Sequence, residues 1–478
     1  MHKHPLRAFL LAAVALLLSA PALLAQIDPG TRQLSHDIFK QLIEINTTDS
    51  VGSTTVAAEA MAQRLRDAGF PASDVVVMGP NPRKGNMVAR LHGTGAHKPV
   101  LLIGHLDVVE ARRSDWTVDP FQFLEKDGYY YGRGTQDMKS DDAIWVTEFI
   151  RFKREGFQPD RDLILALTAD EEGGLSNGVN WLIQNHRDLI DAEFVLNSDG
   201  GGVDSENGKP VIVSMDASEK LYADFQLAVT NPGGHSSLPT PDNAIYHLAD
   251  ALGRLEHYQF PLELNDVTRA YFGRMASVET GQVAADMRAI LNDPPDPAAA
   301  ERLSLDPLNN STLRTTCVAT RLDAGHANNA LPQSAHANVN CRILPGHTRE
   351  EVRQTLVRIV ADPKVEVRYV DNSGRILDSA PNAQALPPVK LRPDVMSTLD
   401  KVAGEMWPGT PVVPTMATGA SDGVYTNGAG MPTYGISGVA IDLNDVRAHG
   451  RDERLRVESF YEGVDFYYRY LKALTSGH

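Results

Sequence analysis

The sequence predicts an α/β protein in which a mostly parallel sheet forms the main domain and a ferredoxin-like α+β domain is inserted into it. Short apolar runs at residues 100–103, 163–168 and 194–197 alternate with helical patterns, as in buried parallel strands joined by crossover helices. From about residue 217 the order becomes strand, helix, strand, strand, helix, strand, which is the ferredoxin-like order. The chain of 478 residues also exceeds what one hydrophobic core usually supports.

The elements of the main domain follow from hydrophobic periodicity. Leu34, Ile38, Leu42 and Ile45 recur at helical spacing, and Gly69 ends the next helical pattern. The expected helices are residues 34–45, 55–68, 143–154, 179–189, 395–407 and 457–474. The expected strands are residues 75–77, 87–91, 100–103, 129–131, 163–168, 194–197, 410–416 and 431–438.

The inserted domain is expected to contain strands at 220–229, 311–322, 334–344 and 364–370, with helices at 244–255 and 349–359. A polar, proline-rich excursion at 260–310 contains helical pieces without clear chemistry. If residues 325–332 join two antiparallel strands, Cys317 and Cys341 lie equidistant from Asn329 and can face each other. A disulfide is then permitted in an oxidising compartment, and two free cysteines remain the alternative.

Four segments organise the chain. Residues 1–25 combine a basic start, an apolar run and small residues, which is typical of a cleaved secretory signal peptide. An N-terminal membrane anchor is the alternative, but the apolar run is short for a span. The main domain comprises residues 26–216 and 389–478, and the inserted domain comprises residues 217–388. We therefore expect an exported, periplasmic or secreted protein without a membrane span after signal cleavage.

The composition excludes some function classes. A net charge of −16 argues against nucleic-acid binding, which needs a concentrated basic surface. With only two cysteines, the chain has neither a disulfide framework nor a thiolate metal site.

Potential metal ligands follow three of the predicted strands. His105 ends the first apolar run, Glu171 and Glu172 end the second, and Asp199 ends the third. Ligands of open α/β sheets gather beyond the carboxyl ends of the strands, so these side chains are expected at one edge. Asp137, at the start of a helix, can reach this edge or act only as a helix cap. A solvated turn is the alternative for the acidic residues.

Asp107 lies two residues after His105 on an extended segment, so both side chains share one face. The carboxylate of Asp107 is expected to hold the imidazole, fix its tautomer and increase its basicity toward a metal.

Together with His449, these residues occur in the motifs GHLDVV, GRGTQDMK, ADEEGG, NSDGG, GGHSS, NNALP and AHGRDE. These motifs extend over nearly all of the chain after residue 25. Through the motifs and their order, the chain resembles the M20 metallopeptidases, including their carboxypeptidase S-like branch. The resemblance implies a parallel-sheet hydrolase domain with two zinc ions, for which Co²⁺ or Mn²⁺ could substitute. In this pattern Asp137 bridges the ions, His105 and Asp199 hold one, and Glu172 and His449 hold the other. Asp107 orients His105, and Glu171 is the general base that takes a proton from the attacking water.

The resemblance also implies that the inserted domain is a lid and dimerisation domain. His235 then donates to the developing oxyanion, from its own subunit or from the second subunit of a homodimer, and Asn329 and Arg342 hold the substrate and its carboxylate. Gly419 lies in a substrate-side loop. The alternatives are a loop histidine, a turn asparagine and a salt-bridged strand arginine.

The predicted function is a zinc-dependent exopeptidase or amidohydrolase that cleaves a peptide or N-acyl amide bond beside a free carboxylate. The substrate is a small peptide or, alternatively, an N-acyl amino acid, as for an aminoacylase. A serine hydrolase is the alternative from another class of enzyme, because residues 419–423 fit the pattern G-x-S-x-G around Ser421. Asp442 or Asp445, followed by His449, would complete the Ser, Asp, His order of an α/β-hydrolase triad. A third possibility is a non-catalytic metal- or peptide-binding protein.

Overall fold

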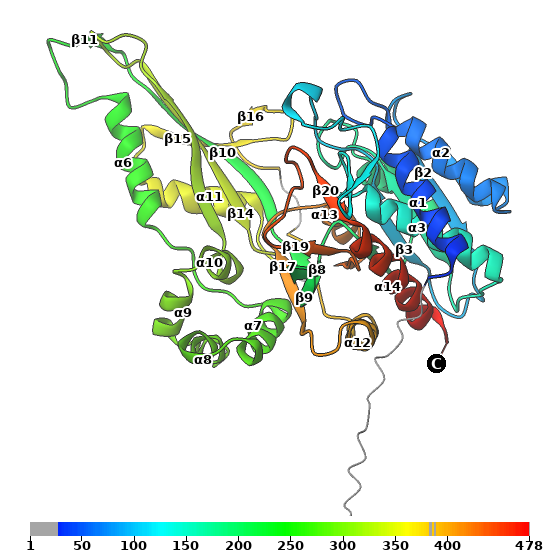
Figure 1. Cartoon of the computed structure of the whole chain (residues 1–478). Coiled ribbons are helices and arrows are strands. Elements are labelled where there is room, and N and C mark those ends of the chain that lie inside the picture. The colour runs from blue at the N-terminus through cyan, green and yellow to red at the C-terminus, as the bar shows by residue number, and fades with distance from the viewer. Residues whose placement is uncertain (1–26, 382–384, 387–388, 478) are drawn as a thin grey trace, which may run out of the picture.

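The computed structural model describes residues 27–381, 385–386 and 389–477, and its main body is a sheet of ten strands between two layers of helices (Figure 1). The predicted signal peptide lies outside the described residues, as do residues 382–384 and 387–388 near the end of the predicted inserted domain. The strand order is β1 (Val75–Met78), β2 (Asn86–Leu91), β6 (Leu163–Thr168), β3 (Val100–His105), β7 (Phe194–Asn197), β18 (Thr433–Gly435), β9 (Lys209–Glu219), β8 (Gly202–Glu206) and β19 (Ala440–Asp442), with β17 (Val412–Ala417) beside β9.

The centre of this sheet is parallel, as predicted: β3 pairs in parallel with β6 and β7, and β7 with β18. Both of its faces are buried, because alternate residues enter different cores. Leu102 packs with the core of one face, while Leu101 packs with the core of the other. One face is covered by α1 (Pro29–Glu44), α2 (Thr54–Asp67), α3 (Lys139–Glu155), α12 (Pro393–Met406) and α14 (Val457–Thr475), and the other by α4 (Gly178–Asn185), α5 (Arg187–Ile190) and α13 (Gly423–Gly428).

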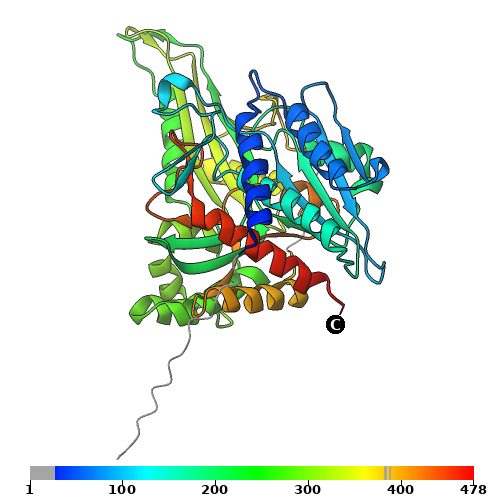
Figure 2. The same cartoon turned by 45° about the vertical axis from the view of Figure 1, so that its right-hand side comes forward.

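The inserted domain is ferredoxin-like. Its antiparallel sheet has the order β12 (Thr316–Ala324), β14 (Ser334–Ile343), β10 (Leu221–Thr230), β15 (Val365–Val370) and β16 (Ile376–Leu377). Helices α6 (Ala244–His257) and α11 (Arg349–Val360) share a core with one face of this sheet. At the far end from the main sheet, β11 (Gly234–His235) pairs with β13 (Ala330–Leu331) to form the lid tip (Figure 2).

Two sequence predictions need correction. The strand expected at 311–322 begins only at Thr316, because Asp306 caps and Pro307 opens a short helix, α10 (Pro307–Leu313). The hairpin of β8 and β9 was not predicted, and its second strand runs to Glu219 within the main sheet. The expected boundary after residue 216 therefore falls inside β9, and the chain passes to the inserted sheet at Lys220.

The helical pieces expected in the excursion are present. The excursion comprises α7 (Asp266–Val278), α8 (Gly281–Ala289), α9 (Pro297–Leu303) and α10. Its small core includes Val413 of β17, so these helices pack against the edge of the main sheet and not within the lid sheet. A three-stranded sheet of β20 (Arg454–Arg456), β5 (Tyr129–Tyr131) and β4 (Leu124–Lys126) lies beside the main sheet. None of the helices in the described ranges has the length and apolar character needed to cross a bilayer.

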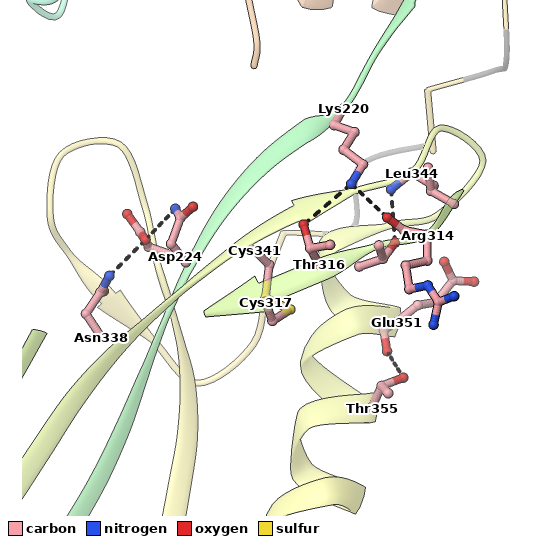
Figure 3. The surroundings of a disulfide bond; sticks show 12 residues. Lys220, Asp224, Arg314, Thr316, Cys317, Asn338, Cys341, Leu344, Glu351 and Thr355 are labelled. Carbon is pink, nitrogen blue, oxygen red and sulfur yellow. Dashed lines mark hydrogen bonds between the residues drawn. A yellow bond between two sulfur atoms is a disulfide. The ribbon is translucent and has the colours of Figure 1, made fainter. Parts of the chain in front are cut away.

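The disulfide that the sequence permits is present. Cys317 and Cys341 face each other in the register of β12 and β14, with their Cα atoms 4.1 Å apart (Figure 3). Near this bond the Lys220 side chain donates to the backbone oxygen of Arg314 at 2.7 Å, which ties the crossing point to the start of β12.

Candidate metal centre

Five predicted ligands meet at one edge of the main sheet. His105 is the last residue of β3, Glu172 follows β6, and Asp199 follows β7. Asp137 lies just before α3, and His449 lies on the loop before β20. Because three of these residues follow neighbouring parallel strands, the backbone topology alone brings them to the same edge.

The ligand atoms form two groups that share Asp137. His105, Asp137 and Asp199 offer one set of atoms, and Asp137, Glu172 and His449 offer the other, each set lying within 4.8 Å. The Nε2 atom of His105 lies 3.1 Å from one Asp137 oxygen, and the Nε2 atom of His449 lies 3.0 Å from the other. The two oxygens of Asp137 therefore face two histidines on opposite sides, which is the geometry of a bridging carboxylate.

The tautomer of His105 is set by a backbone carbonyl. Its Nδ1 lies 3.0 Å from the Asp107 carbonyl oxygen and 3.8 Å from the nearer Asp107 carboxylate oxygen. Because a carbonyl only accepts, Nδ1 carries a proton, and Nε2, on the Asp137 side, is the nitrogen left to bind a metal. The carboxylate of Asp107 instead accepts from the backbone N–H groups of Glu171 at 3.2 Å and Glu172 at 3.0 Å. The expectation that the carboxylate holds the imidazole is corrected in this respect.

The segment that carries Asp137 is held by Glu453, a residue whose role the sequence did not reveal. Glu453 is fully buried and accepts from the backbone N–H groups of Gly134 and Gln136, the latter at 2.7 Å. Its carboxylate also pairs with the guanidinium of Arg133 at 2.6 Å. The loop before α3 is thereby fixed from the same chain segment that bears His449.

Negative charge accumulates at this edge. Burial raises the pKa of Asp199 well above its usual value, and burial together with neighbouring carboxylates raises the pKa of Glu171 to about 8. The hydrogen bond to Asp137 raises the pKa of His449 to about 9. Burial alone would lower the pKa of His105, but its carboxylate neighbours raise it well above the ordinary value. Such crowding of acids favours a compensating cation.

The residues present fit a pair of divalent metal ions. Imidazole nitrogens and carboxylate oxygens are ordinary zinc ligands, and two three-ligand sets with one shared carboxylate leave open positions on each ion. The buried Nε2 of His105 and Oδ1 of Asp137 form no hydrogen bond with any of the described residues. Both atoms belong to the first ligand group, where a metal would satisfy them.

A cavity of about 280 Å³ opens beside this edge. Glu171 lines it with four of the five ligand residues, all except His105, and Gly419 lines it from the predicted substrate-side loop. Several other lining residues were not predicted from the sequence. These are Asn197, Asp216, Ser218 and Glu219, of which the last three lie on the unpredicted strand β9.

The lid residues do not join this cavity within one chain. His235 and Asn329 lie at the lid tip, where His235 is exposed and its Nδ1 lies 2.7 Å from Ser237 Oγ. Arg342 lies on β14 with its guanidinium 4.8 Å from the centre of the Tyr222 ring. The histidine and asparagine that were predicted to contact substrate are thus presented away from the metal centre of their own subunit (Figure 1).

Ser421 does not form the predicted serine triad. Its hydroxyl lies 3.0 Å from Glu219 and 3.0 Å from Asn197, whereas His449 contacts Asp137 and Glu172. Asp442, a candidate triad member, accepts hydrogen bonds from backbone N–H groups. Asp445, the other candidate, pairs with two arginines. The described residues therefore bring no histidine to Ser421.

A fold with two adjoining His and carboxylate groups at a parallel sheet edge is that of a metallohydrolase. The model of peptidase family M20/M25/M40 matches residues 101–473, so the chain belongs to this family of metallopeptidase hydrolases. Probable carboxypeptidase S-like 2 of Dictyostelium discoideum is 30% identical over 395 residues, covering 78% of this chain and 71% of that protein. Human N-fatty-acyl-amino acid synthase/hydrolase PM20D1 is 29% identical over 387 residues, covering 78% and 74%.

Solved structures share the fold at low sequence identity. The M20 family metallo-carboxypeptidase Sso-CP2 of Sulfolobus solfataricus superposes with a TM-score of 0.67 at 16% identity, covering 94% of this chain and 99% of that one. Human carnosine dipeptidase 1 gives 0.62 at 16% identity, covering 93% and 96%. The Bacillus subtilis YXEP protein, described as a dinuclear metal binding peptidase, gives 0.57 at 10% identity, covering 93% and 98%.

Proposed function

We propose that this enzyme is a di-zinc hydrolase that cleaves a peptide or N-acyl amide bond next to a free carboxylate. The observation that carries the proposal is the position of Asp137, whose two oxygens face His105 and His449 at 3.1 and 3.0 Å. A single carboxylate shared by two ligand groups is suited to two ions about 3.5 to 4 Å apart. Zinc fits this donor set, with Co²⁺ or Mn²⁺ as substitutes.

Ions held by these residues would supply Lewis acidity for the scissile carbonyl and for the attacking water. Glu171 accepts the proton of the attacking water and delivers it to the leaving amine. Its position supports this role, because it lines the cavity beside the ligand groups while its backbone N–H is fixed by Asp107. Glu171 is partly buried, and a carboxylate held beside the ligand groups can accept a proton from water and pass it to the leaving amine.

The lid completes the site in a homodimer, in this proposal. His235 and Asn329 are exposed at the lid tip, so a second copy could receive them beside its own metal centre. There His235 would donate to the developing oxyanion, and Arg342 would hold the substrate carboxylate. The N-terminal sequence pattern supports export, and thus a role in hydrolysing peptides or acylated amino acids outside the cytoplasm.

The substrate class is tested by incubating the zinc-loaded protein, residues 26–478, with a mixed pool of free dipeptides and N-acylated amino acids. Mass spectrometry then shows which members disappear. Loss of dipeptides defines a dipeptidase, and loss of only N-acyl amino acids defines the aminoacylase-like alternative that the similarity to PM20D1 favours. Survival of both sets contradicts the proposed function and leaves a metal- or peptide-binding protein.

The role of Glu171 is tested by Glu171→Gln. The amide cannot accept the proton, so turnover should fall by ~10²- to 10⁴-fold while both metal ions stay bound. Unchanged turnover would show that the base lies elsewhere.

A further inference from the structure

Glu219 is a buried carboxylate beside the metal centre that the proposed chemistry does not use. It is the last residue of β9 and is 8% exposed. One carboxylate oxygen, Oε2, accepts from the backbone N–H of Ser421 at 2.9 Å and from its hydroxyl at 3.0 Å. The other, Oε1, has no hydrogen-bond partner among the described residues. The strand that delivers Glu219 is irregular, because its register with β17 shifts between Asp216 and Ser218.

Through Ser421, Glu219 holds the loop of residues 419–423 against the strand end that carries a predicted ligand. The Ser421 hydroxyl accepts from the side-chain amide of Asn197 at 3.0 Å and from the backbone N–H of Gly423 at 3.1 Å. Asn197 also accepts from the backbone N–H of Asp199 at 3.0 Å. The loop is therefore tied to the end of β7.

The next residue of the loop continues this network toward Glu171. Asp422 is 5% exposed, and its carboxylate accepts from the side-chain amide of Asn177 at 2.6 Å and the hydroxyl of Thr168 at 3.4 Å. The same Asn177 amide donates to the carbonyl of Asp170 at 3.2 Å. Because Asp170 directly precedes Glu171, a continuous chain of contacts links Glu219 to the segment bearing the proposed base.

Gly423 shows how closely the loop sits on Glu219. A Cβ atom at this position would lie 2.6 Å from Glu219 Oε1, which is closer than non-bonded atoms approach. The loop can therefore pack this closely against the Glu219 carboxylate only because residue 423 has no side chain.

We infer that Glu219 is a positioning residue: it sets the 419–423 loop, and through Asp422 and Asn177 the backbone at Glu171. This inference rests on the proposed role of Glu171 as the base. It differs from a catalytic role, because Glu219 acts through other residues.

The test measures kcat, KM, bound metal and Tm for Glu219→Ala and Glu219→Gln. Displacement of the base by about 1 Å costs roughly 10²-fold, so Glu219→Ala should lower kcat by about 10- to 100-fold while two metal equivalents remain. Glu219→Gln keeps an oxygen acceptor for Ser421 and should recover most of kcat. The matched control is Glu148→Gln on α3, because Glu148 is also fully buried and its oxygens form no hydrogen bond with the described residues, the nearest cation being Arg151 at 3.9 Å. It should lower Tm without changing kcat.

A double-mutant cycle tests the contact itself. Gly423→Ala should lower kcat severalfold in the wild-type protein but much less in the Glu219→Ala background, where only the 3.2 Å contact with Ser421 Oγ remains. Gly404→Ala is the control, because a Cβ there meets nothing within 4 Å. Equal costs of Gly423→Ala in both backgrounds, or a kcat of Glu219→Ala equal to that of the Glu148 control, would overturn the inference.

Two further arms keep the outcomes distinguishable. If Glu219→Ala does not fold, Ser421→Ala removes one of the two donors to Glu219 and should lower kcat at unchanged metal content; an unchanged kcat contradicts the inference. Glu171→Gln measured in parallel tests the proposed function separately. If it retains turnover, the base assignment fails and the inference fails with it. If only the Glu219 variants retain turnover, the positioning role alone fails.

Discussion

The metal edge and the lid tip carry residues proposed for the same reaction, but they are held in very different ways. At the metal edge, His105 is 1% exposed, and the loop bearing Asp137 is fixed by the buried pair of Arg133 and Glu453. At the lid tip, His235 is exposed, and its strand β11 is two residues long. The metal edge is thus preorganised by contacts within the described chain, whereas the lid tip would need a second surface to act as proposed.

This difference separates two kinds of catalytic requirement. Metal ligands must be held within a few tenths of an ångström before substrate arrives, and a rigid sheet edge provides this. An oxyanion donor is needed only once substrate is bound, so it can come from a mobile lid or from another subunit. The predictions below test this division between the two regions.

The largest effect is expected at the shared ligand. Asp137→Asn removes the negative charge that faces both histidines, so both ligand groups weaken together. Activity should fall roughly a thousandfold, because the metal contribution amounts to several kcal/mol of transition-state stabilisation. Metal analysis should show fewer than two equivalents per chain. Asp188→Asn, at an exposed position of α5, is the control and should keep both ions. Two firmly bound ions in Asp137→Asn would rule out the bridging role.

The next effect is expected at the lid tip. His235→Ala should lower kcat by ~10²- to 10³-fold, the usual cost of losing an oxyanion donor, without loss of metal. If the histidine acts on a second copy, mixing His235→Ala with Glu171→Gln should restore activity. Random exchange of subunits would give roughly one quarter of the wild-type rate, because half of the dimers then contain one intact site. Failure of the mixture to recover activity, with His235→Ala inactive alone, would place the histidine in its own subunit's site.

The same division explains which residues could be predicted from the sequence. His105, Glu172 and Asp199 were predictable because each follows an apolar run, and parallel strands bring such positions to one edge. Glu219 and Asp216 were not, because the hairpin of β8 and β9 was not recognised as part of the main sheet. Asp422 could not be placed at all, since its contacts with Thr168 and Asn177 join segments about 250 residues apart.

Which oxygen of Asp107 contacts His105 could not be predicted from the sequence either. The spacing of His105 and Asp107 indicates that they meet, but a backbone carbonyl or a carboxylate can serve equally well at that spacing. Only the fold shows that the carboxylate turns toward the N–H groups of Glu171 and Glu172.

A smaller effect is therefore expected from Asp107→Asn. The carbonyl that orients His105 remains, while one of the two bonds from the Glu171 and Glu172 N–H groups is lost. Metal affinity should fall about 10-fold, at the low end for residues that support ligands. The measurement is a competition titration with a zinc chelator. A loss as large as that of Asp137→Asn would mean that the carboxylate does more than hold this backbone.

The smallest effect on catalysis is expected from the disulfide, which lies in the lid sheet. Replacing Cys317 and Cys341 together with alanine removes a link that closes a loop of 24 residues, and should destabilise the lid by about 3 kcal/mol. The metal edge shares no core with these residues, so metal content should not change. Thermal unfolding followed with and without a thiol reductant measures the effect, since reduction should lower the Tm of the wild-type protein but not of the double variant. If the variant also loses metal, then the two regions are energetically coupled, and the lid would contribute to holding the metal edge even though it supplies none of the proposed ligands.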